Sequence, residues 1–358
     1  MREPGFVNAH THVYSALAPL GMPPPASAPA NFLEILERVW WPLDRALDES
    51  SLRAASRLYV AKALLHGTTV LVDHHESPSF IDGSLDVIAD ACEELGLRAV
   101  LCYGATERNG GRDEARRGLA ECRRFIMTNR RPLVRAVVGL HASFTVSDDT
   151  MREAGALARE LQTVVHVHVA EDVADVADAI GRGYAGPLER IEAMGALRPG
   201  SILAHGVHLG AAQVRRADAL GCWIVQNPRS NRHNKVGYPP ALSASARVAL
   251  GTDGFESDVQ CELDVLAEEA AAHGDDADTI AVRAAGGAAL VANLWDGDAA
   301  DPDQIAGSCE RDGDRVTRVT IAGRAVVDRG QLQTGDVHEI EAEGRAAAVA
   351  LWKRMAQA

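Results

Sequence analysis

Eight short apolar runs, rich in β-branched residues, recur along the first 254 residues, and segments with helical periodicity separate most of them. Such continuous apolar runs are typical of parallel strands that are buried on both faces. Amphipathic segments such as Ser84–Leu95 and Asp148–Leu161 would supply the covering helices. Eight strand–helix units favour an α/β fold of the (β/α)8 barrel type over an open doubly wound sheet. The expected strands are Gly5–His12, Thr68–His75, Arg98–Glu107, Leu133–Ser143, Thr163–Glu171, Ser201–His208, Gly221–Pro228 and Arg247–Gly254.

The connection after the first strand is long. Asn31–Leu47 and Ser50–Leu65 have the pattern of two successive helices, and the proline-rich loop GMPPPASAPAN precedes them. At the catalytic face of a barrel such a loop could act as a lid, or it could be a packed excursion. No glycine-rich GxGxxG turn follows the first strand, which argues against dinucleotide binding.

Charge and cysteine usage narrow the class of partner. The 36 basic and 50 acidic residues give a net charge of −14, which opposes binding to nucleic acid or to an anionic membrane. The six cysteines are scattered without a CxxC pair, as is usual for reduced thiols. The N-terminus lacks a signal-peptide pattern, and no stretch is apolar enough for a membrane span. These features predict a cytoplasmic protein that acts on a small molecule.

Histidines concentrate where the expected strands end. Of the thirteen in the chain, nine fall at carboxyl ends of strands, which form one rim in a (β/α)8 barrel. Because active sites of such barrels lie at this rim, the clustering predicts a catalytic or metal site. The nine are His10, His12, His74, His75, His141, His166, His168, His205 and His208.

The first strand offers a metal-binding pair. His10 and His12 are two residues apart, so strand alternation turns both side chains to one face, into the barrel mouth. Two imidazoles so placed can ligate one metal ion. On the fifth strand His166 and His168 share a face, so either could be a further ligand, and the strand end favours His168.

Two acidic residues complete this rim. Glu171 follows His168 by three positions and can move a proton without binding the metal; the alternative is a neighbour of a helix cap. Asp253, in Gly-Thr-Asp-Gly after the eighth strand, can bind the metal and accept a proton from water; the alternative is a turn aspartate.

Other polar side chains on the rim are less specific. His205 and His141 complete the ring and could polarise a substrate. Adjacent residues point to opposite sides, so at most one of His74 and His75 faces the mouth. Arginines on the rim loops, Arg108 among them, could receive an anionic group, although loop arginines are more often solvated.

The chain resembles the amidohydrolase superfamily, in the branch of cytosine, guanine and S-adenosylhomocysteine deaminases and of triazine chlorohydrolases. The matching motifs are PGFVNAHTH, HGTTVLVD, HVHVAE, ILAHGVH, NPRSN and LGTDG, which occur in family order between Pro4 and about Asp303. The runs FLEILERVWWPLDRALD, DHHESPS, CYGATERNGG and GLHASFTVSDD resemble a subgroup of SsnA-like aminohydrolases.

The resemblance implies one divalent metal ion, Zn²⁺ in the first place and Fe²⁺ as the alternative. Its ligands would be His10, His12, His168 and Asp253, a set in which Asp253 is also catalytic. Glu171 and His205 would be the other catalytic residues. His141 and, more remotely, Glu34 would contact the substrate. The turn Ser230–Asn231 matches a family motif that is as readily structural as substrate-binding.

The implied reaction is hydrolytic deamination of a small, amidine-type heterocycle. Hydroxide formed from metal-bound water would attack the ring carbon, and ammonia would leave. The nearest alternative keeps the fold and the metal but cleaves a lactam, an imidazolone or a carbon–chlorine bond. An alternative of another class is a catalytically silent, metal-binding scaffold.

The C-terminal part departs from the family pattern. Helices are expected at Val259–His273, Asp276–Leu294 and Val337–Ala358, with one β-hairpin at Arg315–Val327 that turns at Ala322–Gly323. The family's β-sandwich therefore looks reduced to a hairpin remnant, unless the true start lies upstream. We expect a catalytic barrel over residues 1–303, a hairpin and helix over 304–358, and a homodimer that covers exposed barrel surface.

Overall fold

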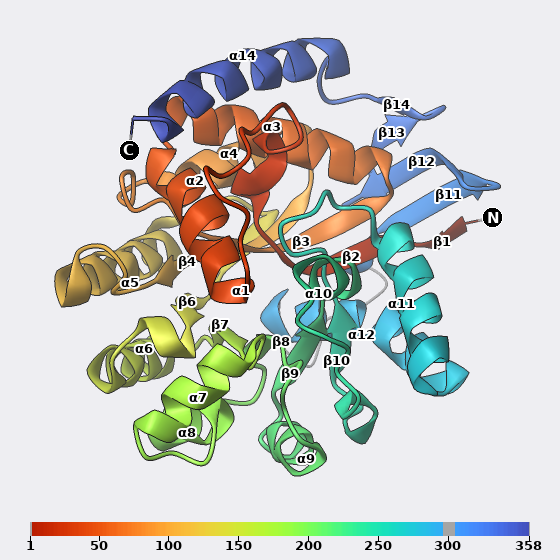
Figure 1. The fold of residues 1–358 in the computed structure, drawn as a ribbon. Helices are drawn as coiled ribbons and strands as arrows, with labels where there is room; N and C mark the ends of the chain where they lie inside the picture. The colour runs from red at the N-terminus through yellow and green to blue at the C-terminus, as the bar shows by residue number, and fades with distance from the viewer. Residues whose placement is uncertain (1, 296–304, 358) are drawn as a thin grey trace.

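The computed structural model describes residues 2–295 and 305–357, and within them eight parallel strands surround a common centre (Figure 1). The hydrogen-bonded order runs β2-β3-β4-β6-β7-β8-β9-β10. The backbone amides of Thr252 and Asp253 donate to the carbonyl of His10 at 2.9 and 3.0 Å, which closes the barrel. This confirms the predicted (β/α)8 class. The strands are β2 (Phe6–Thr11), β3 (Thr68–His75), β4 (Arg98–Ala105), β6 (Val138–Ala142), β7 (Val165–Val169), β8 (Ile202–His205), β9 (Trp223–Gln226) and β10 (Val248–Leu250), and β5 (Val134–Ala136) pairs with β4 alone.

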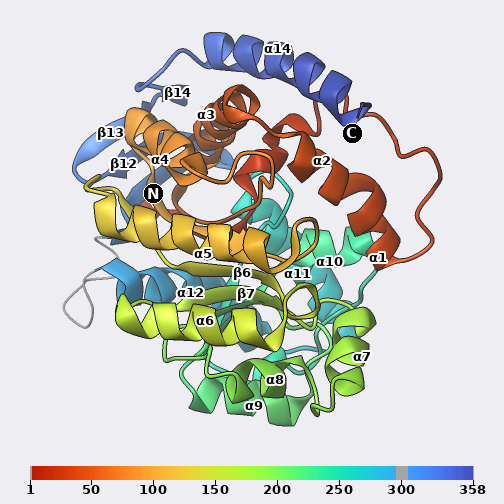
Figure 2. The same ribbon diagram turned by 90° about the vertical axis from the view of Figure 1, so that its left-hand side faces the viewer.

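Amphipathic helices cover the barrel, as the helical periodicity predicts. In Figure 2, α5 and α6 run side by side over β6 and β7. The strands beneath are almost wholly buried, and every residue of β3 is inaccessible to solvent, which explains why the sequence shows continuous apolar runs. The covering helices are α4 (Ser84–Leu95), α5 (Gly111–Thr128), α6 (Asp148–Glu160), α7 (Val173–Gly181), α8 (Pro187–Ala193), α9 (Ala211–Ala219), α10 (Pro228–Asn234), α11 (Val259–His273) and α12 (Ala277–Trp295), with short 3₁₀ turns at Val13–Leu17, Ser143–Thr145 and Leu242–Ala244.

The long first connection is helical, as expected. Asn31 caps its first turn by accepting a hydrogen bond from the amide of Glu34 at 3.0 Å. Pro42 lacks an amide hydrogen, and a wider π-helical turn precedes it. Asp48 and Ser51 form a capping box at the start of the next helix. The elements are α1 (Phe32–Ile35), η2 (Leu36–Trp40), α2 (Trp41–Ala46) and α3 (Glu49–Leu65).

An antiparallel sheet beside the barrel is larger than the expected hairpin. The hairpin is present, and its turn residues Ala322 and Gly323 both have positive φ, 50° and 80°. However, Ser308–Asp312 also forms a strand and pairs with the N-terminal strand Arg2–Pro4. The strand Arg2–Pro4 is exposed and Ser308–Asp312 is mostly half-buried, with Cys309 as the one buried residue of the two, so they carry little hydrophobic pattern. The order is β1 (Arg2–Pro4), β11 (Ser308–Asp312), β12 (Arg315–Ile321), β13 (Arg324–Asp328) and β14 (Gln331–Leu332).

The expected domain boundary between residues 303 and 304 lies outside the described residues. Homodimer formation stays a prediction, because the structure contains a single chain. No helix in the described ranges is long and apolar enough to cross a membrane.

The terminal helix α14 (Val337–Met355) packs across α3 and braces the first connection (Figure 1). Leu351 is fully buried in the same hydrophobic cluster as Leu58 of α3. The Trp352 indole donates to the carbonyl of Leu20 at 3.2 Å, and Arg354 pairs with Asp48 at 2.9 Å. The C-terminal segment thus holds elements that lead to the barrel mouth.

We expect Leu351→Ala to lower the free energy of unfolding by about 2–5 kcal/mol, because it leaves a cavity between α14 and α3. The matched control is Val349→Ala, two residues away and 56% exposed, which should stay within about 0.5 kcal/mol of the parent. Urea denaturation followed by circular dichroism measures both. Equal effects of the two substitutions would contradict this packing.

Candidate active site

The predicted site residues converge at the carboxyl ends of the barrel strands. His10 lies on β2, His168 on β7 and His205 at the end of β8, while Asp253 follows β10. One side-chain atom from each of these four lies within 4.8 Å of the others. Parallel strands deliver their carboxyl ends to one rim, so residues far apart in sequence meet here.

His12 joins the same centre. Its Nε2 lies 3.0 Å from Asp253 Oδ1 and 3.2 Å from His168 Nε2, and His10 Nε2 lies 3.5 Å from the same carboxylate oxygen. The structure therefore brings together all four predicted ligands, His10, His12, His168 and Asp253, and adds His205 beside them. Their binding of a metal ion stays a prediction.

These donors suit a divalent metal ion. Among the described residues, the Nε2 atoms of His10 and His205 are buried and have no hydrogen-bond partner. A buried lone pair without a partner is costly, and a metal ion would satisfy it. Imidazole nitrogens with one carboxylate oxygen form a typical zinc ligand set.

Hydrogen bonds on the far side of each imidazole orient the candidate ligands. His12 Nδ1 lies 2.6 Å from the carbonyl of His74, and His168 Nδ1 bonds the carbonyl of His141. His10 Nδ1 faces His166 Nε2 at 2.9 Å. Because a carbonyl oxygen only accepts, the first two contacts place a proton on Nδ1 of His12 and of His168 and leave Nε2 directed at the centre. Of the two histidines left open on β7, His168 thus faces the centre and His166 supports His10.

The two adjacent histidines of β3 point in opposite directions, as alternation predicts. The His74 ring lies 4.6 Å from that of His168, inside the barrel. His75 faces away, with Nε2 at 2.7 Å from Ser77 Oγ.

Electrostatics divide the histidines of the site into two groups. Burial would lower the pKa of His12, but Glu76 and Asp253 outweigh it and raise this pKa well above its usual value. Burial lowers the pKa of His10 to about 3, and burial also lowers the pKa of His168 and of His205. Burial raises the pKa of Asp253, but the nearby imidazoles of His10 and His12 outweigh it and hold this pKa well below its usual range. A neutral imidazole has the free lone pair that a ligand needs.

Glu171 lies beside this centre, and its Oε2 is 3.5 Å from His205 Nε2. Burial, followed by the charge of Asp253, raises the pKa of Glu171 well above its usual value. A raised pKa favours the protonated carboxyl group, which is the form that can donate a proton. The helix cap of α7 is provided by Asp172, which accepts from the amide of Ala174 at 2.9 Å.

Two site residues have left-handed backbone conformations, with φ of 74° at His205 and 52° at Asp253. Such conformations cost on the order of 1–3 kcal/mol for a non-glycine residue and cluster at functional sites. The turn Ser230–Asn231 steadies both: Ser230 Oγ bonds Asp253, and Asn231 Oδ1 lies 3.1 Å from His205 Nδ1. This turn thus contacts catalytic candidates directly.

A small inner pocket opens above the candidate ligands. His141 and Glu171 lie on its wall, and aromatic side chains enclose it. His141 Nδ1 is held at 2.9 Å from Thr145 Oγ1. The aromatic residues are Tyr14, Phe32, Trp40, Trp41 and Phe144.

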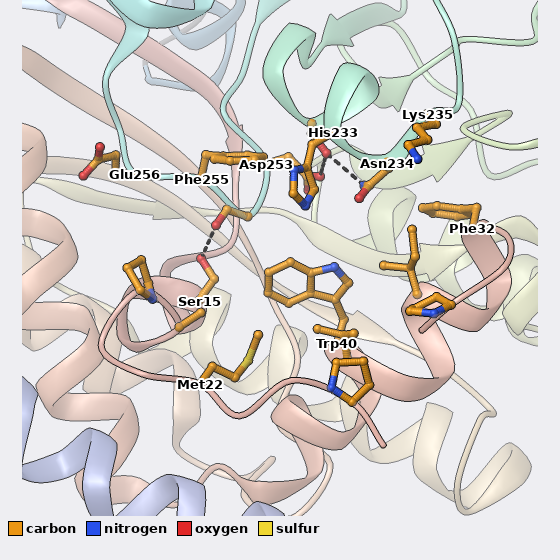
Figure 3. Close-up of a pocket in the computed structure, with 18 of the residues that line it drawn as sticks. Ser15, Met22, Phe32, Trp40, His233, Asn234, Lys235, Asp253, Phe255 and Glu256 are labelled. Atoms are coloured by element: carbon orange, nitrogen blue, oxygen red, sulfur yellow. Dashed lines mark hydrogen bonds between the residues drawn. The ribbon is translucent and has the colours of Figure 1, made fainter. Parts of the chain in front are cut away.

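An outer cavity of about 750 Å³ adjoins the inner pocket and shares Trp40 and Asp253 with it. Figure 3 shows the Trp40 indole in its centre, between Phe32 on one side and Ser15 on the other, with His233 above. The proline-rich loop lines one wall through Met22, together with Pro25 and Pro29. Whether this loop closes as a lid stays a prediction.

Glu34 does not line either of these two cavities. Its carboxylate accepts from the amide of Ala30 at 2.7 Å and pairs with Arg38 at 3.0 Å. Its expected substrate contact therefore stays a prediction without support from this geometry.

Asp44 is the carboxylate that the first connection brings to the inner pocket, and sequence reasoning missed it. It is 1% exposed, and Arg108 Nη2 lies 2.8 Å from its Oδ2. Burial raises the pKa of Asp44 to about 6, against the opposing effect of Arg108. Asp44 lies in an amphipathic helix, where an aspartate usually faces solvent, so the pattern gave no signal. Its ion pair with Arg108 connects α2 to the loop that follows β4.

Comparison with known proteins places this geometry in a family. Residues 2–293 match the Amidohydrolase family. The chain is 30% identical over 284 residues to 8-oxoguanine deaminase of Pseudomonas aeruginosa, covering 75% of this chain and 62% of that protein. It is 30% identical over 273 residues to 5-methylthioadenosine/S-adenosylhomocysteine deaminase of Pyrococcus abyssi, covering 74% and 60%. The chain thus spans about three fifths of the length of these curated relatives.

Solved structures agree on the fold. An adenosine deaminase from Xanthomonas campestris with bound zinc has a TM-score of 0.81 and 23% identity, covering 100% of this chain and 86% of that one. An atrazine chlorohydrolase from Arthrobacter aurescens complexed with zinc has a TM-score of 0.78 and 18% identity, covering 97% and 88%. The extent of the family match, together with the histidine-rich rim of the barrel, leads to one conclusion: the chain belongs to the amidohydrolase family.

Proposed function

We propose that the chain is a metal-dependent hydrolase that releases ammonia from a small, amidine-type heterocycle. The observation that carries the proposal is the meeting of His10, His12, His168 and Asp253 around unpartnered nitrogen atoms, with Glu171 beside them. The donor set of three imidazoles and a carboxylate favours Zn²⁺. The named activities of the relatives, which deaminate purine-type compounds, support the choice of reaction.

A divalent ion held by His10, His12, His168 and Asp253 would lower the pKa of a water molecule from about 16 toward 7. Asp253, ionised in this site, accepts a proton from the attacking water. Glu171, protonated in this site, donates its proton to the ring nitrogen next to the attacked carbon, so that negative charge does not build up there.

His205 donates no proton in this scheme. Its ring lies next to Glu171, where it orients the attacking oxygen and stabilises the tetrahedral carbon. Collapse of that carbon breaks the exocyclic C–N bond, and the leaving nitrogen takes the proton held by Asp253, so ammonia departs. The hydroxyl proton of the former tetrahedral carbon returns to Glu171, which leaves a ring C=O in the product and restores both carboxyl groups.

The pocket walls support a flat substrate. Trp40, Trp41 and Phe144 enclose the inner pocket and offer stacking surfaces to an aromatic ring. His141 lies on the same wall as a substrate contact. The outer cavity leaves room for a substituent on that ring.

The same site could expel chloride or open a lactam, because neither change alters the residues that hold the metal or activate water. An ammonia-release screen of purines, pterins, pyrimidines and cyclic amidines, with chloride release measured in parallel, separates the alternatives. Zinc bound without turnover of any compound would favour the scaffold alternative.

We expect Asp253→Ala to lower zinc affinity by more than the roughly 10–100-fold that loss of an outer hydrogen-bond partner costs, because Asp253 is the anionic donor of the set. Competition with a chromophoric chelator measures the affinity, and circular dichroism checks the fold. Asp82→Ala is the control, since the Asp82 side chain is 72% exposed and pairs only with Arg117 among the described residues. Unchanged affinity in Asp253→Ala would refute the ligand assignment.

We expect Glu171→Gln to lower kcat by about 10²–10⁴ on a substrate found in the screen, because the amide cannot deliver the proton. Zinc content should be unchanged, which separates proton transfer from metal binding. Glu49→Gln, at a carboxylate that is 61% exposed on α3, is the control. A Glu171→Gln enzyme that turns over at the parent rate would show that the proton comes from elsewhere.

A further inference from the structure

A buried histidine–glutamate pair lies next to the candidate metal ligands and has no part in the proposed proton transfers. His74 is fully buried, and Glu76, which follows β3, is 1% exposed. His74 Nδ1 lies 2.6 Å from Glu76 Oε1. The His74 ring packs edge-on against both His168 and His166, with centroids 4.6 and 4.8 Å apart.

The neighbouring strand leaves space for this pair. Gly104 of β4 lies opposite it, and a Cβ atom at this position would come within 2.4 Å of Glu76 Oε1 and 2.5 Å of His74 Cε1. These separations are far below van der Waals contact, so a larger residue would displace the pair. The absence of a side chain at Gly104 therefore makes the space that His74 and Glu76 occupy.

Both nitrogen atoms of the His74 ring have a polar partner. His74 Nε2 faces the carbonyl of Leu140 at 2.9 Å, while Nδ1 faces the Glu76 carboxylate at 2.6 Å. These two contacts fix the orientation of the ring and connect it to Glu76. Polar groups buried this completely are stable only when they are hydrogen-bonded.

The pair connects to the metal site through His12. The carbonyl of His74 lies 2.6 Å from His12 Nδ1, and Glu76 Oε2 lies 3.3 Å from the same nitrogen. Two acceptors thus face one ring nitrogen, which fixes the proton there. The ring then presents its Nε2 lone pair to the centre occupied by Asp253 and His168.

The same three residues could instead be a second metal site, since ligand atoms of His12, His74 and Glu76 lie within 4.8 Å of one another. The hydrogen bonds argue against it. His12 Nδ1 faces the His74 carbonyl, and the two ring nitrogen atoms of His74 face Glu76 and the Leu140 carbonyl. A cation bound here would break these contacts.

We propose that Glu76 and His74 are positioning residues: as a buried, hydrogen-bonded pair accommodated by Gly104, they fix the tautomer and orientation of His12 and so tighten metal binding at the candidate site. The inference rests on the metal site of the proposed function and does not depend on which compound is the substrate. Carboxylates that orient a ligating histidine typically contribute about 10–100-fold to metal affinity.

The test is zinc affinity, measured on the metal-free full-length chain by competition with a chromophoric chelator. Glu76→Gln should bind zinc roughly 10–100-fold more weakly than the parent. Glu76→Asp keeps the charge but withdraws the carboxylate, and it should fall between the two. The visible spectrum of the Co²⁺-loaded chain should change in Glu76→Gln, because the geometry at His12 relaxes. Gly104→Ala displaces the pair without changing either of its residues, and it should act in the same direction.

A matched control separates positioning from general destabilisation. Glu121 is also a buried carboxylate, 2% exposed, but it pairs with Arg124 on α5, remote from the ligands. Glu121→Gln should bind zinc as tightly as the parent, with an unchanged Co²⁺ spectrum. Equal losses of affinity in Glu121→Gln and Glu76→Gln would overturn the positioning role. If Glu76→Gln does not fold, the same criteria apply to Glu76→Asp.

Three further results would contradict the inference in different ways. Parent-like zinc affinity in Glu76→Gln would overturn the positioning role and leave the proposed function intact. Two zinc ions per parent chain, one of them lost in Glu76→Gln, would identify the second metal site instead. A parent chain that binds no zinc would overturn the metal site of the proposed function, and the positioning role with it.

Discussion

The hydrogen bonds that close the barrel are the constraint on which the site depends. The amides of Thr252 and Asp253 donate to the carbonyl of His10, and the amide of His12 donates to the carbonyl of Asp253 at 3.1 Å. These bonds join β2, the first strand of the barrel, to the segment after β10, its last strand, about 240 residues later. Asp253 has a left-handed conformation there, and its carboxylate reaches His10 on β2 and His12 just after this strand. The residues that close the barrel are therefore also residues of the candidate metal site.

The sequence predicts the barrel well because burial on both faces gives its strands an apolar pattern. It also predicts the rim residues, since strand alternation places His10 and His12 on one face. It does not predict β1 and β11, whose single buried residue leaves no pattern. Asp44 and Glu76 were missed for a related reason: an acidic residue in a helix or after a strand looks solvent-exposed until tertiary packing buries it.

The titratable groups of the barrel mouth are arranged around the candidate ligands. The His74–Glu76 pair lies next to the ligand histidines. Asp253 and Glu171 contact His12 and His205 respectively. The Asp44–Arg108 pair lies in the wall supplied by the first connection. Each charge has a partner or a metal role, as burial requires, and the aromatic residues around them limit access of water to the reacting atoms.

We propose that one divalent ion binds between β2, β7 and the end of β10. Anomalous diffraction from a crystal of the zinc-loaded chain, measured on both sides of the zinc edge, tests it most directly. We expect one strong anomalous peak at about 2.0–2.2 Å from the Nε2 atoms of His10, His12 and His168 and from a carboxylate oxygen of Asp253. A zinc-loaded crystal with no peak there, or with its peak between His74 and Glu76, would contradict it.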